Sequence, residues 1–490
     1  MAEEHEFGPG IDPARLADAL AVIRELDELH TEHPDAVAMR QATGHLFKSV
    51  KLRRKREAKD RKLAEDAAIT AATATGAPGR IDDETAGILL QATDSGIIGT
   101  LNTARGCYIC KTRYTEVDAF YHQLCPACAR ENHAKRDATV DLTGRRALLT
   151  GGRAKIGMYI ALRLLRDGAH TTITTRFPAD AIRRFESMPD SAEWLHRLKI
   201  VGIDLRDPRQ VIALADSVAE AGPLDILINN ACQTVRRSPG SYGHLVAGET
   251  VDQQWLDAAT PEVLVLGRPH DAHPLAITGL ASPLLTDGES MTAAAEKMTE
   301  LALTAGSSSL ERTAAGTAID AGGLVPDIVD INSWTQSVDQ VDMVELLEVQ
   351  LCNSTAPFLL VSRLRPAMAA SPARRTYVVN VSAMEGQFSR GYKGPGHPHT
   401  NMAKAALNML TRTSAQEMFE ADGILMTAVD TGWITDERPH TTKARLHEEG
   451  FHAPLDLVDG AARVYDPVVR GEQGEDLFGV FLKDFKPHPW

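Results

Sequence analysis

The chain has 490 residues, a length typical of two to four domains. Hydrophobic residues make up 43% of it and charged residues 24%, which excludes collagen-like, mucin-like and wholly disordered chains. Acidic residues outnumber basic ones 66 to 52, and the resulting net charge of −14 argues against a protein that binds polyanions over its whole surface.

The cellular location is predicted from two features. No uninterrupted apolar run reaches about 18 residues, so the sequence predicts no segment that spans a bilayer. The opening residues, Met-Ala-Glu-Glu-His-Glu-Phe, lack the basic and apolar regions of a signal peptide. We therefore expect a cytoplasmic protein, in which clustered cysteines favour metal binding over disulfides.

The N-terminal residues 11–66 are predicted to be helical, because apolar side chains recur at a spacing of about 3.6, with an interruption at His33-Pro34. Segment 48–62 carries nine Lys or Arg against two acids. This pattern is typical of a solvated charged helix, and contact with nucleic acid or an acidic protein is the alternative. Residues 68–80, rich in Ala, Thr, Gly and Pro, predict a linker. We accordingly divide this part into a helical region, 1–72, and a linker with a small module, 73–138.

Two C-x-x-C pairs follow, Cys107 with Cys110 and Cys125 with Cys128, separated by 14 residues. Each pair presents two sulfurs to one point, so the four thiolates predict a tetrahedral Zn²⁺ site of the zinc-ribbon kind. Four protein ligands leave no open position, which makes the predicted metal structural. A redox dithiol is the alternative for either pair alone.

From residue 139 the pattern alternates between strands and helices. A short apolar strand, 146–150, runs into the glycine turn 151–157 and then into a helix. Further strands end at Arg176, at Asp204-Leu205, and just before Asn229-Asn230-Ala231. This order predicts an α/β fold with a doubly wound, parallel sheet of Rossmann type, in which backbone N–H groups and the helix N-terminus hold a pyrophosphate.

These motifs resemble the short-chain dehydrogenase/reductase family over roughly 139–232 and 341–490. Thr150-Gly151 to Gly157 is similar to the family's T-G-x-x-x-G-x-G cofactor turn, with Lys155 in place of the middle glycine. Asn229-Asn230-Ala231 is similar to its N-N-A-G element, with Cys232 in place of glycine. The resemblance implies a sheet of about seven strands and pairing into a homodimer or homotetramer through the helices near 341–366 and 401–420.

The second half of the chain continues the resemblance. Asn353 resembles the helix asparagine that supports the family's proton relay, and the strand at 379–383 resembles the one that precedes the active site. Asn401-Met-Ala-Lys404 resembles the start of the helix that carries the active-site lysine, and segment 429–435 resembles the one that closes over the nicotinamide. The resemblance implies the following cofactor contacts: Gly151, Arg153, Lys155, Ile156, Gly157, Arg176, Asp204, Leu205, Asn230, Ala231, Lys404, Gly432 and Ile434.

Charge predicts which nicotinamide cofactor is used. NAD-dependent enzymes place an acid after the second strand to bind the ribose hydroxyls, whereas NADP-dependent ones place a cation there for the 2′-phosphate. Here Arg176 holds that position, with Arg153 and Lys155 in the turn and no acid among them. A guanidinium binds phosphate oxygens in a bidentate manner, so NADP(H) is favoured over NAD(H).

The proton donor is less obvious. The resemblance implies a tyrosine four residues before Lys404, but Thr400 stands there, and an alkyl hydroxyl is too weak an acid to replace a phenol. The serine position is Ala383, beside Ser382. Two interpretations stay open. In one, Tyr392 or His399 from the long loop 387–400 supplies the proton while Ser382 orients the carbonyl; in the other, the domain binds NADP(H) without turnover, as a sensor or scaffold.

An insertion at about 233–339 has no counterpart in the family after the fourth strand. Because it follows the carboxyl end of a strand, we expect it over the cofactor crevice, as a lid or a surface for a partner. The predicted function is NADP(H)-dependent hydride transfer between nicotinamide and a carbonyl or alcohol.

Overall fold

The computed structural model describes residues 10–78, 80, 96–249, 255–256, 259–266, 297, 300, 310–434 and 437–490. The chain divides into two compact units, Met1–Ala68 and Ile69–Trp490. The boundary comes a few residues before the end of the helical region expected from the sequence. The Cys module and the Rossmann sheet, expected as separate parts, lie in one unit.

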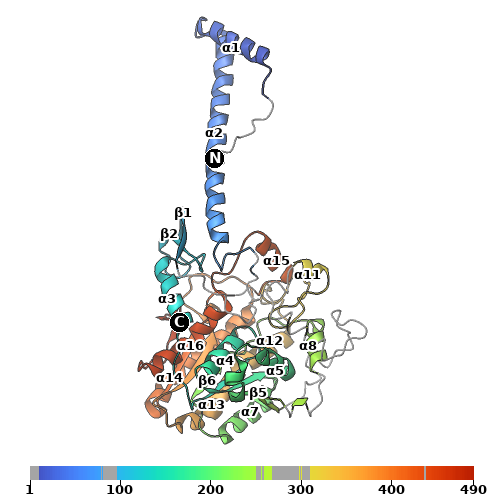
Figure 1. The fold of residues 1–490 in the computed structure, drawn as a ribbon, viewed down its shortest axis with the longest axis vertical. Coiled ribbons are helices and arrows are strands. Elements are labelled where there is room, and N and C mark those ends of the chain that lie inside the picture. The colour runs from blue at the N-terminus through green and yellow to red at the C-terminus, as the bar shows by residue number, and fades with distance from the viewer. Residues whose placement is uncertain are drawn as a thin grey trace. The chain divides into compact units, whose positions relative to one another are not determined.

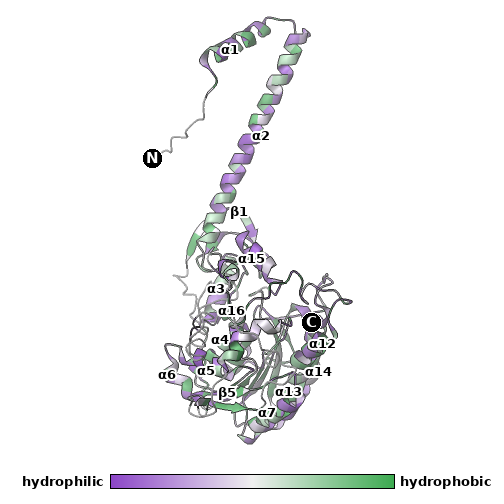
Figure 2. Cartoon of the chain, turned by 90° about the vertical axis from the view of Figure 1, so that its right-hand side faces the viewer, coloured by the Kyte–Doolittle hydropathy of each residue, from purple (hydrophilic) through white to green (hydrophobic). Residues whose placement is uncertain are grey.

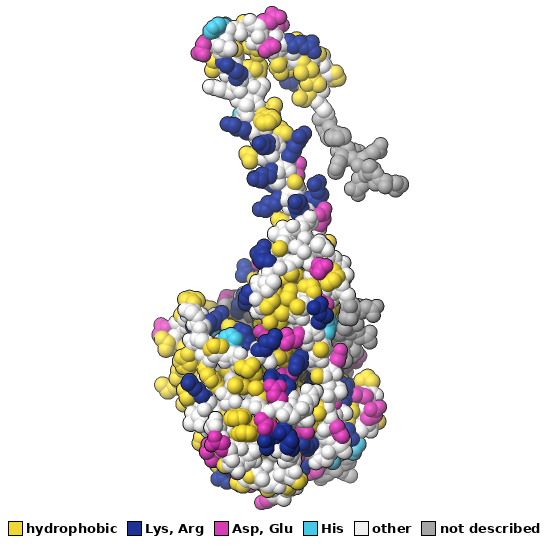
Figure 3. All heavy atoms as spheres, turned by 90° about the vertical axis from the view of Figure 1, so that its left-hand side faces the viewer, with side chains coloured by type: hydrophobic (Ala, Val, Ile, Leu, Met, Phe, Trp, Pro, Cys, Tyr) yellow, Lys and Arg dark blue, Asp and Glu magenta, His cyan; other side chains and the backbone are white. Residues whose placement is uncertain are grey.

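The first unit consists of helix α1 (Pro13–Asp27) and most of α2 (Pro34–Ala71). The Asp12 carboxylate caps α1 by accepting the N–H groups of Ala14 and Arg15. The predicted helices and their break before Pro34 are confirmed. Hydrophilic residues dominate the middle of α2 (Figure 2), and the nine Lys and Arg of 48–62 are all exposed on it (Figure 3).

The segment expected as a linker is packed into the second unit. Helix α2 continues to Ala71, and Thr73 and Thr75 are at most 1% exposed. The Thr75 hydroxyl donates to the carbonyl of Phe120 at 2.8 Å. The linker prediction is therefore wrong for residues 68–78: the small side chains that suggested flexibility instead allow the backbone to pack closely against a neighbouring segment.

A nine-stranded sheet forms the centre of the second unit, in the order β11-β10-β9-β8-β6-β3-β4-β5-β7 (Figure 1). All neighbours are parallel except β10 and β11. The strands are β3 (Arg146–Leu149), β4 (His170–Thr175), β5 (Leu198–Gly202), β6 (Ile226–Asn229), β7 (Glu262–Val265), β8 (Thr376–Ser382), β9 (Ile424–Asp430), β10 (Phe481–Lys483) and β11 (Lys486–His488).

Seven of these strands, β5-β4-β3-β6-β8-β9-β10, confirm the predicted doubly wound sheet. The other two lie at the edges, and β7 comes from the insertion, pairing with β5. Since β3, β6, β8 and β9 run parallel, the segments that follow them meet at one edge of the sheet. That edge carries the predicted site residues.

Helices cover both faces of the sheet. One apolar core includes side chains of α4, α5 and α16, and the other includes those of α7, α13 and α14. The helices and turns of the second unit after the Cys module are α4 (Lys155–Arg166), α5 (Pro178–Glu186), α6 (Ser191–Trp194), η1 (Leu195–Arg197), α7 (Pro208–Glu220), η2 (Pro239–Tyr242), α8 (Gly243–Gly248), α11 (Leu310–Ala314), α12 (Met343–Gln350), the π-helical turn η4 (Leu351–Thr355), α13 (Ala356–Ala369), η5 (Met384–Gly386), α14 (Pro398–Asp422), α15 (His440–Glu448) and α16 (Leu457–Glu472).

One described helical stretch, Met343–Ala369, is long and apolar enough to cross a membrane by length and composition alone. Half of its most apolar window is buried inside the fold, as expected for a helix that packs on a sheet. It comprises α12, η4 and α13.

The Cys module consists of the antiparallel hairpin β1 (Ile97–Gly106) and β2 (Arg113–Asp118) and helix α3 (Pro126–Arg136). It shares an apolar core with α4 and α16 of the Rossmann part. Buried ion pairs add to this contact, because the Arg136 guanidinium lies 2.6 Å from Asp456 and 3.0 Å from Asp459, both in or next to α16. The module is thus built into the side of the sheet domain.

Candidate functional site

The glycine turn between β3 and α4 is as tight as its sequence predicts. Gly151 has a φ of +69°, in the left-handed region that favours glycine. A Cβ on Gly157 would lie 1.9 Å from the carbonyl oxygen of Gly151, so only glycine fits. The turn therefore leaves the N-terminus of α4 open to an anionic group.

Asn230 and Ala231, which follow β6, form hydrogen bonds with this turn. The Asn230 amide donates to the carbonyls of Thr150 and Gly151 at 3.0 and 3.1 Å. The Thr150 hydroxyl accepts the backbone N–H groups of Asn230 and Ala231, each at 3.0 Å. These four bonds explain why an asparagine follows the strand, and they hold the turn rigid before any ligand binds.

Lys155 begins α4 with a φ of +52°. It takes the left-handed conformation that the family's glycine would adopt without strain, at a cost of about 1–2 kcal/mol for a residue with a Cβ. Its ammonium lies 3.7 Å from the carboxylate of Asp320, a 4% exposed residue of the insertion. The substitution thus brings a cation into the turn and pairs it with an inserted acid.

Arg153 is also paired with groups that sequence reasoning did not place beside it. Its guanidinium forms an ion pair with Asp180 of α5 and donates to the carbonyl of Gly322 at 2.6 Å. Arg184 contacts the same Asp180 carboxylate at 2.6 Å. Although burial opposes it, the two guanidiniums hold the pKa of Asp180 well below its usual range. Part of the insertion therefore packs on the glycine turn, in agreement with its expected place over the crevice.

Arg176, just after β4, is the predicted cation that has no carboxylate within ion-pair distance among the described residues. Its guanidinium lies over the rings of Phe177 and Tyr242, 5.6 and 5.1 Å from their centroids. Such cation–π contacts orient a guanidinium and leave its N–H edges free to donate.

Asp204 and Leu205 follow β5. The Asp204 carboxylate accepts the guanidinium of Arg206 at 2.6 Å and the Arg206 backbone N–H at 3.0 Å. Burial opposes ionisation, but the Arg206 guanidinium lowers the pKa of Asp204 to about 2. The acid is therefore ionised and already bonded, and Leu205 is buried beside it.

Asn353 lies in the π-helical turn η4 and is 1% exposed. Its amide exchanges two hydrogen bonds of 2.8 Å with the backbone of Gln233, one with the N–H and one with the carbonyl. These two bonds connect the π-helical turn η4 to the segment that follows Ala231.

Lys404 and Ser382 come together at the ends of α14 and β8. The Lys404 ammonium is 5% exposed and donates to the carbonyl of Val381 at 2.7 Å. The Ser382 hydroxyl donates to the amide oxygen of Asn408 at 2.5 Å. A lysine with one backbone acceptor keeps two further N–H donors for a ligand.

Thr400, at the position of the family's tyrosine, and the two candidates for the proton step, His399 and Tyr392, differ in burial. Thr400 is 1% exposed, and its hydroxyl has no hydrogen-bond partner among the described residues. His399 is 2% exposed, its Nε2 lies 4.0 Å from Glu345 Oε1, and burial lowers the pKa of its imidazole. Tyr392 is 76% exposed.

Gly432 and Ile434 follow β9. Gly432 has a φ of +78°, and its N–H donates to Asp430 Oδ1 at 3.0 Å. Ile434 is 4% exposed and packs at Gly460 of α16, where Ile156 of the glycine turn also packs. Thr435, the last residue of the predicted closing segment, lies outside the described residues.

Asp430 is buried in this segment, and burial raises its pKa to about 6 from an ordinary value near 3.8. Because the folded protein holds this proton more tightly than the unfolded chain, the contribution of Asp430 to stability is fully present below pH 3.8 and is lost as the pH rises through 6. We expect Asp430→Asn to stabilise the protein by about 3 kcal/mol above pH 7, and by little near pH 4. Urea unfolding of both proteins from pH 4 to 8 measures this; an equal gain at every pH would contradict it.

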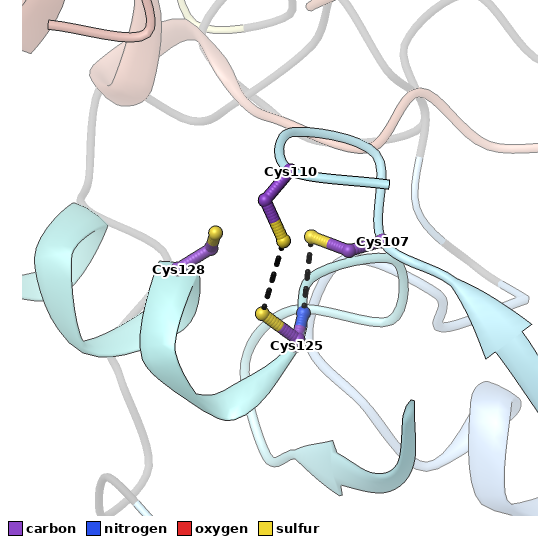
Figure 4. Close-up of side chains that lie close together, drawn as sticks. All are labelled: Cys107, Cys110, Cys125 and Cys128. Atoms are coloured by element: carbon purple, nitrogen blue, oxygen red, sulfur yellow. Dashed lines mark hydrogen bonds between the residues drawn. The ribbon is translucent and has the colours of Figure 1, made fainter. Parts of the chain in front are cut away.

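The four predicted metal ligands converge. The sulfur atoms of Cys107, Cys110, Cys125 and Cys128 all lie within 4.8 Å of one another, with Cys110 and Cys125 3.6 Å apart (Figure 4). A tetrahedral Zn²⁺ with Zn–S bonds of about 2.3 Å needs sulfurs nearly 3.8 Å apart, so the set fits this ion. Two pairs in one cluster are arranged for a metal centre rather than for two independent dithiols.

Sequence reasoning missed the acids that neutralise the turn. Asp180 stands four residues after Arg176, at the start of α5, a position where acids also occur simply because they favour helix N-termini. Asp320 lies in the insertion, where no motif marks it. Glu345, near His399, likewise carries no local signal.

Comparison with known proteins finds the following similarities. Residues 145–249 match the family model described as short chain dehydrogenase. An uncharacterised protein of Acanthamoeba polyphaga mimivirus is 31% identical over 380 residues, which are 74% of this chain and 71% of that protein. A probable oxidoreductase of Streptomyces antibioticus is 39% identical over 92 residues, 19% of this chain and 30% of that protein. A dehydrogenase/reductase structure from Sinorhizobium meliloti 1021 shares 17% identity over 71% of this chain and 96% of that chain, with a TM-score of 0.41.

The matched region contains the glycine turn and the residues that end β4, β5 and β6. The same strands lie side by side in the parallel sheet, in the order β5-β4-β3-β6. The chain therefore belongs to the short-chain dehydrogenase/reductase family of NAD(P)-dependent oxidoreductases.

Proposed function

We propose that this protein is an NADP(H)-dependent oxidoreductase that transfers hydride between nicotinamide and a carbonyl or alcohol substrate. The observation that carries the proposal is the rigid glycine turn, closed by Asn230 and Thr150, next to a guanidinium, Arg176, with no described carboxylate at ion-pair distance. A turn at a helix N-terminus suits a pyrophosphate, and a free guanidinium edge suits a 2′-phosphate.

The other residues that would contact the cofactor lie at the same edge of the sheet. Gly151 to Gly157 would bind the pyrophosphate through backbone N–H groups, Asp204 would accept from the adenine amino group, and Lys404 would donate to the nicotinamide ribose. Gly432 and Ile434 would cover the nicotinamide. When bound, the cofactor supplies a hydride to the substrate carbon, or accepts one from it.

The proton that accompanies the hydride needs a donor or acceptor from the protein. We favour His399 over Tyr392, because His399 is buried in the first turn of α14, five residues before Lys404, whereas Tyr392 is exposed. Since burial lowers its pKa, the His399 ring is mainly neutral at pH 7, the form that accepts a proton from an alcohol. Ser382 would orient the substrate oxygen.

A fluorescence titration with NADPH and NADH, followed by a panel of carbonyl and alcohol substrates, tests the proposal. We expect tight NADPH binding and substrate-dependent oxidation or reduction. Tight binding without turnover would instead support a silent NADP(H)-binding sensor or scaffold. Absence of binding would contradict both, since it would mean that Lys155 and the inserted residues close the turn.

The role of Arg176 has its own test. We expect Arg176→Ala to weaken NADPH binding by about 10- to 100-fold, the loss of one charge-assisted contact, while NADH binding changes less than threefold. Arg209→Ala, which removes an 83% exposed guanidinium, is the matched control and should change neither affinity. Equal loss for both cofactors would show that Arg176 does not read the 2′-phosphate.

A further inference from the structure

A direct hydrogen bond connects the metal module with the cofactor edge of the sheet. Tyr108 lies between the ligands Cys107 and Cys110, and its phenolic oxygen accepts the backbone N–H of Trp433 at 2.9 Å. The two residues are 325 positions apart in the sequence. Trp433 stands between Gly432 and Ile434, so a side chain of the metal loop holds the backbone of the segment that follows β9.

That segment and the glycine turn both lie against α16. A Cβ on Gly460 would lie 3.0 Å from Ile434 Cδ1 and 3.4 Å from Ile156 Cδ1, so both isoleucine side chains lie against the same glycine of α16. Ile156 lies beside Gly157 in the turn itself. The path therefore runs from Tyr108 through Trp433 and Ile434 to Gly460, against which Ile156 also lies.

The loop that carries Tyr108 is held by hydrogen bonds and contains two of the four clustered cysteines. Its loop is bonded on one side, where the Tyr108 N–H donates to the carbonyl of Gln123 at 2.8 Å and the Cys107 N–H donates to Thr112 at 2.9 Å. On the other side, Cys110 is exposed, and its sulfur lies 3.6 Å from the sulfur of Cys125. A metal bound by all four sulfurs would join this side of the loop to the start of α3 (Figure 4).

We propose that the Cys₄ metal site is part of the cofactor-binding machinery, with Tyr108 as the positioning residue that couples the bound metal to segment 430–434. With metal bound, Tyr108 is fixed and holds Trp433, which keeps Ile434 against Gly460, where Ile156 of the glycine turn also lies. Without it, the loop loosens, the hydrogen bond to Trp433 is lost, and the segment no longer covers the cofactor in one position. This inference rests on the proposed function, since it assigns NADPH to the turn.

The test compares Tyr108→Phe with Tyr114→Phe, each in the full chain. Tyr108→Phe removes the acceptor oxygen and keeps the ring. Tyr114 is a matched control, because its hydroxyl lies in the same module but donates to the carbonyl of His122 at 3.1 Å. Three quantities are measured: zinc per chain, amide hydrogen exchange of a peptide that contains Trp433, and the Kd for NADPH.

We expect Tyr108→Phe to keep one zinc per chain, to speed exchange at Trp433 by about 5- to 10-fold, and to weaken NADPH binding by a similar factor, as the loss of one hydrogen bond implies. Tyr114→Phe should match the wild type in all three, and wild-type protein stripped of zinc by a chelator should exchange at least as fast as Tyr108→Phe.

Two results would overturn the inference: unchanged exchange at Trp433 in Tyr108→Phe, or faster exchange with an unchanged Kd for NADPH. Failure of the proposed function has a different signature, because the wild-type protein with its full zinc content would then not bind NADPH at all. The exchange measurement needs no cofactor, so the coupling between the metal loop and Trp433 is read in either case.

Discussion

Replacing Gly157 with alanine is expected to abolish NADPH binding, with a loss of at least 100-fold in affinity. The added methyl carbon would lie 1.9 Å from the carbonyl oxygen of Gly151 and 2.8 Å from the Asn230 amide nitrogen. Neither group can move away cheaply, because the oxygen belongs to the backbone of the turn and the amide donates to two of its carbonyls. The helix start would have to shift by more than 1 Å, and its N–H groups would no longer converge on a pyrophosphate.

The measurement is the fluorescence titration with NADPH, together with a thermal melt that shows the sheet still folded. Gly240→Ala serves as the control, since a Cβ on this exposed glycine would meet nothing within 4 Å. Wild-type affinity in Gly157→Ala would contradict the assignment of this turn to the cofactor. If Gly157→Ala does not fold, Gly152→Ala is tested in its place. Its methyl group would lie 2.5 Å from the Ile173 side chain and not from backbone atoms of the turn.

The second large effect is expected from the metal ligands. The double variant Cys125→Ser, Cys128→Ser should bind no zinc. It should therefore lose the metal-binding free energy that stabilises the folded module, on the order of 10 kcal/mol for a typical structural Zn²⁺ site. The hairpin β1–β2 and the two C-x-x-C loops should melt at temperatures where the parallel sheet persists, because these loops lose the metal that would join their four sulfurs.

Elemental analysis for zinc and differential scanning calorimetry measure the two halves of this prediction. Cys232→Ser is the control, because Cys232 is an exposed cysteine outside the cluster and should leave both quantities unchanged. One zinc per chain retained in the double variant would exclude these cysteines as the ligands. A wild-type protein that contains no zinc but a disulfide in one C-x-x-C pair would support the redox alternative.

Local patterns determined most of the fold. The strand, glycine turn and helix at 146–166 are specified by residues that are neighbours in the sequence, since apolar runs form the buried strand and only glycine allows the turn. Each C-x-x-C pair likewise places two sulfurs by local geometry. For this reason the doubly wound parallel sheet and the convergence of the four cysteines could be predicted from the amino-acid sequence.

Only the tertiary structure decided which cations of the site are paired with carboxylates. The sequence places three cations near the cofactor turn, Arg153, Lys155 and Arg176, but in the structure Arg153 and Lys155 are paired with Asp180 and Asp320. Arg153 also bonds Gly322, 169 residues away. No periodicity encodes such a pairing, because it depends on where an insertion of over a hundred residues returns to the sheet.

The sequence likewise could not predict which residues are buried, or that the metal module contacts the sheet. Residues 73–78 resemble a linker in composition, yet Thr75 is fully buried, because small side chains suit close packing as well as they suit a flexible chain. The hydrogen bond from Trp433 to Tyr108 joins two motifs that were predicted separately. The sequence by itself determined the elements and their chemistry; only the tertiary structure decided which of them touch, since long-range contacts are selected by the packing of the whole chain and leave no local pattern.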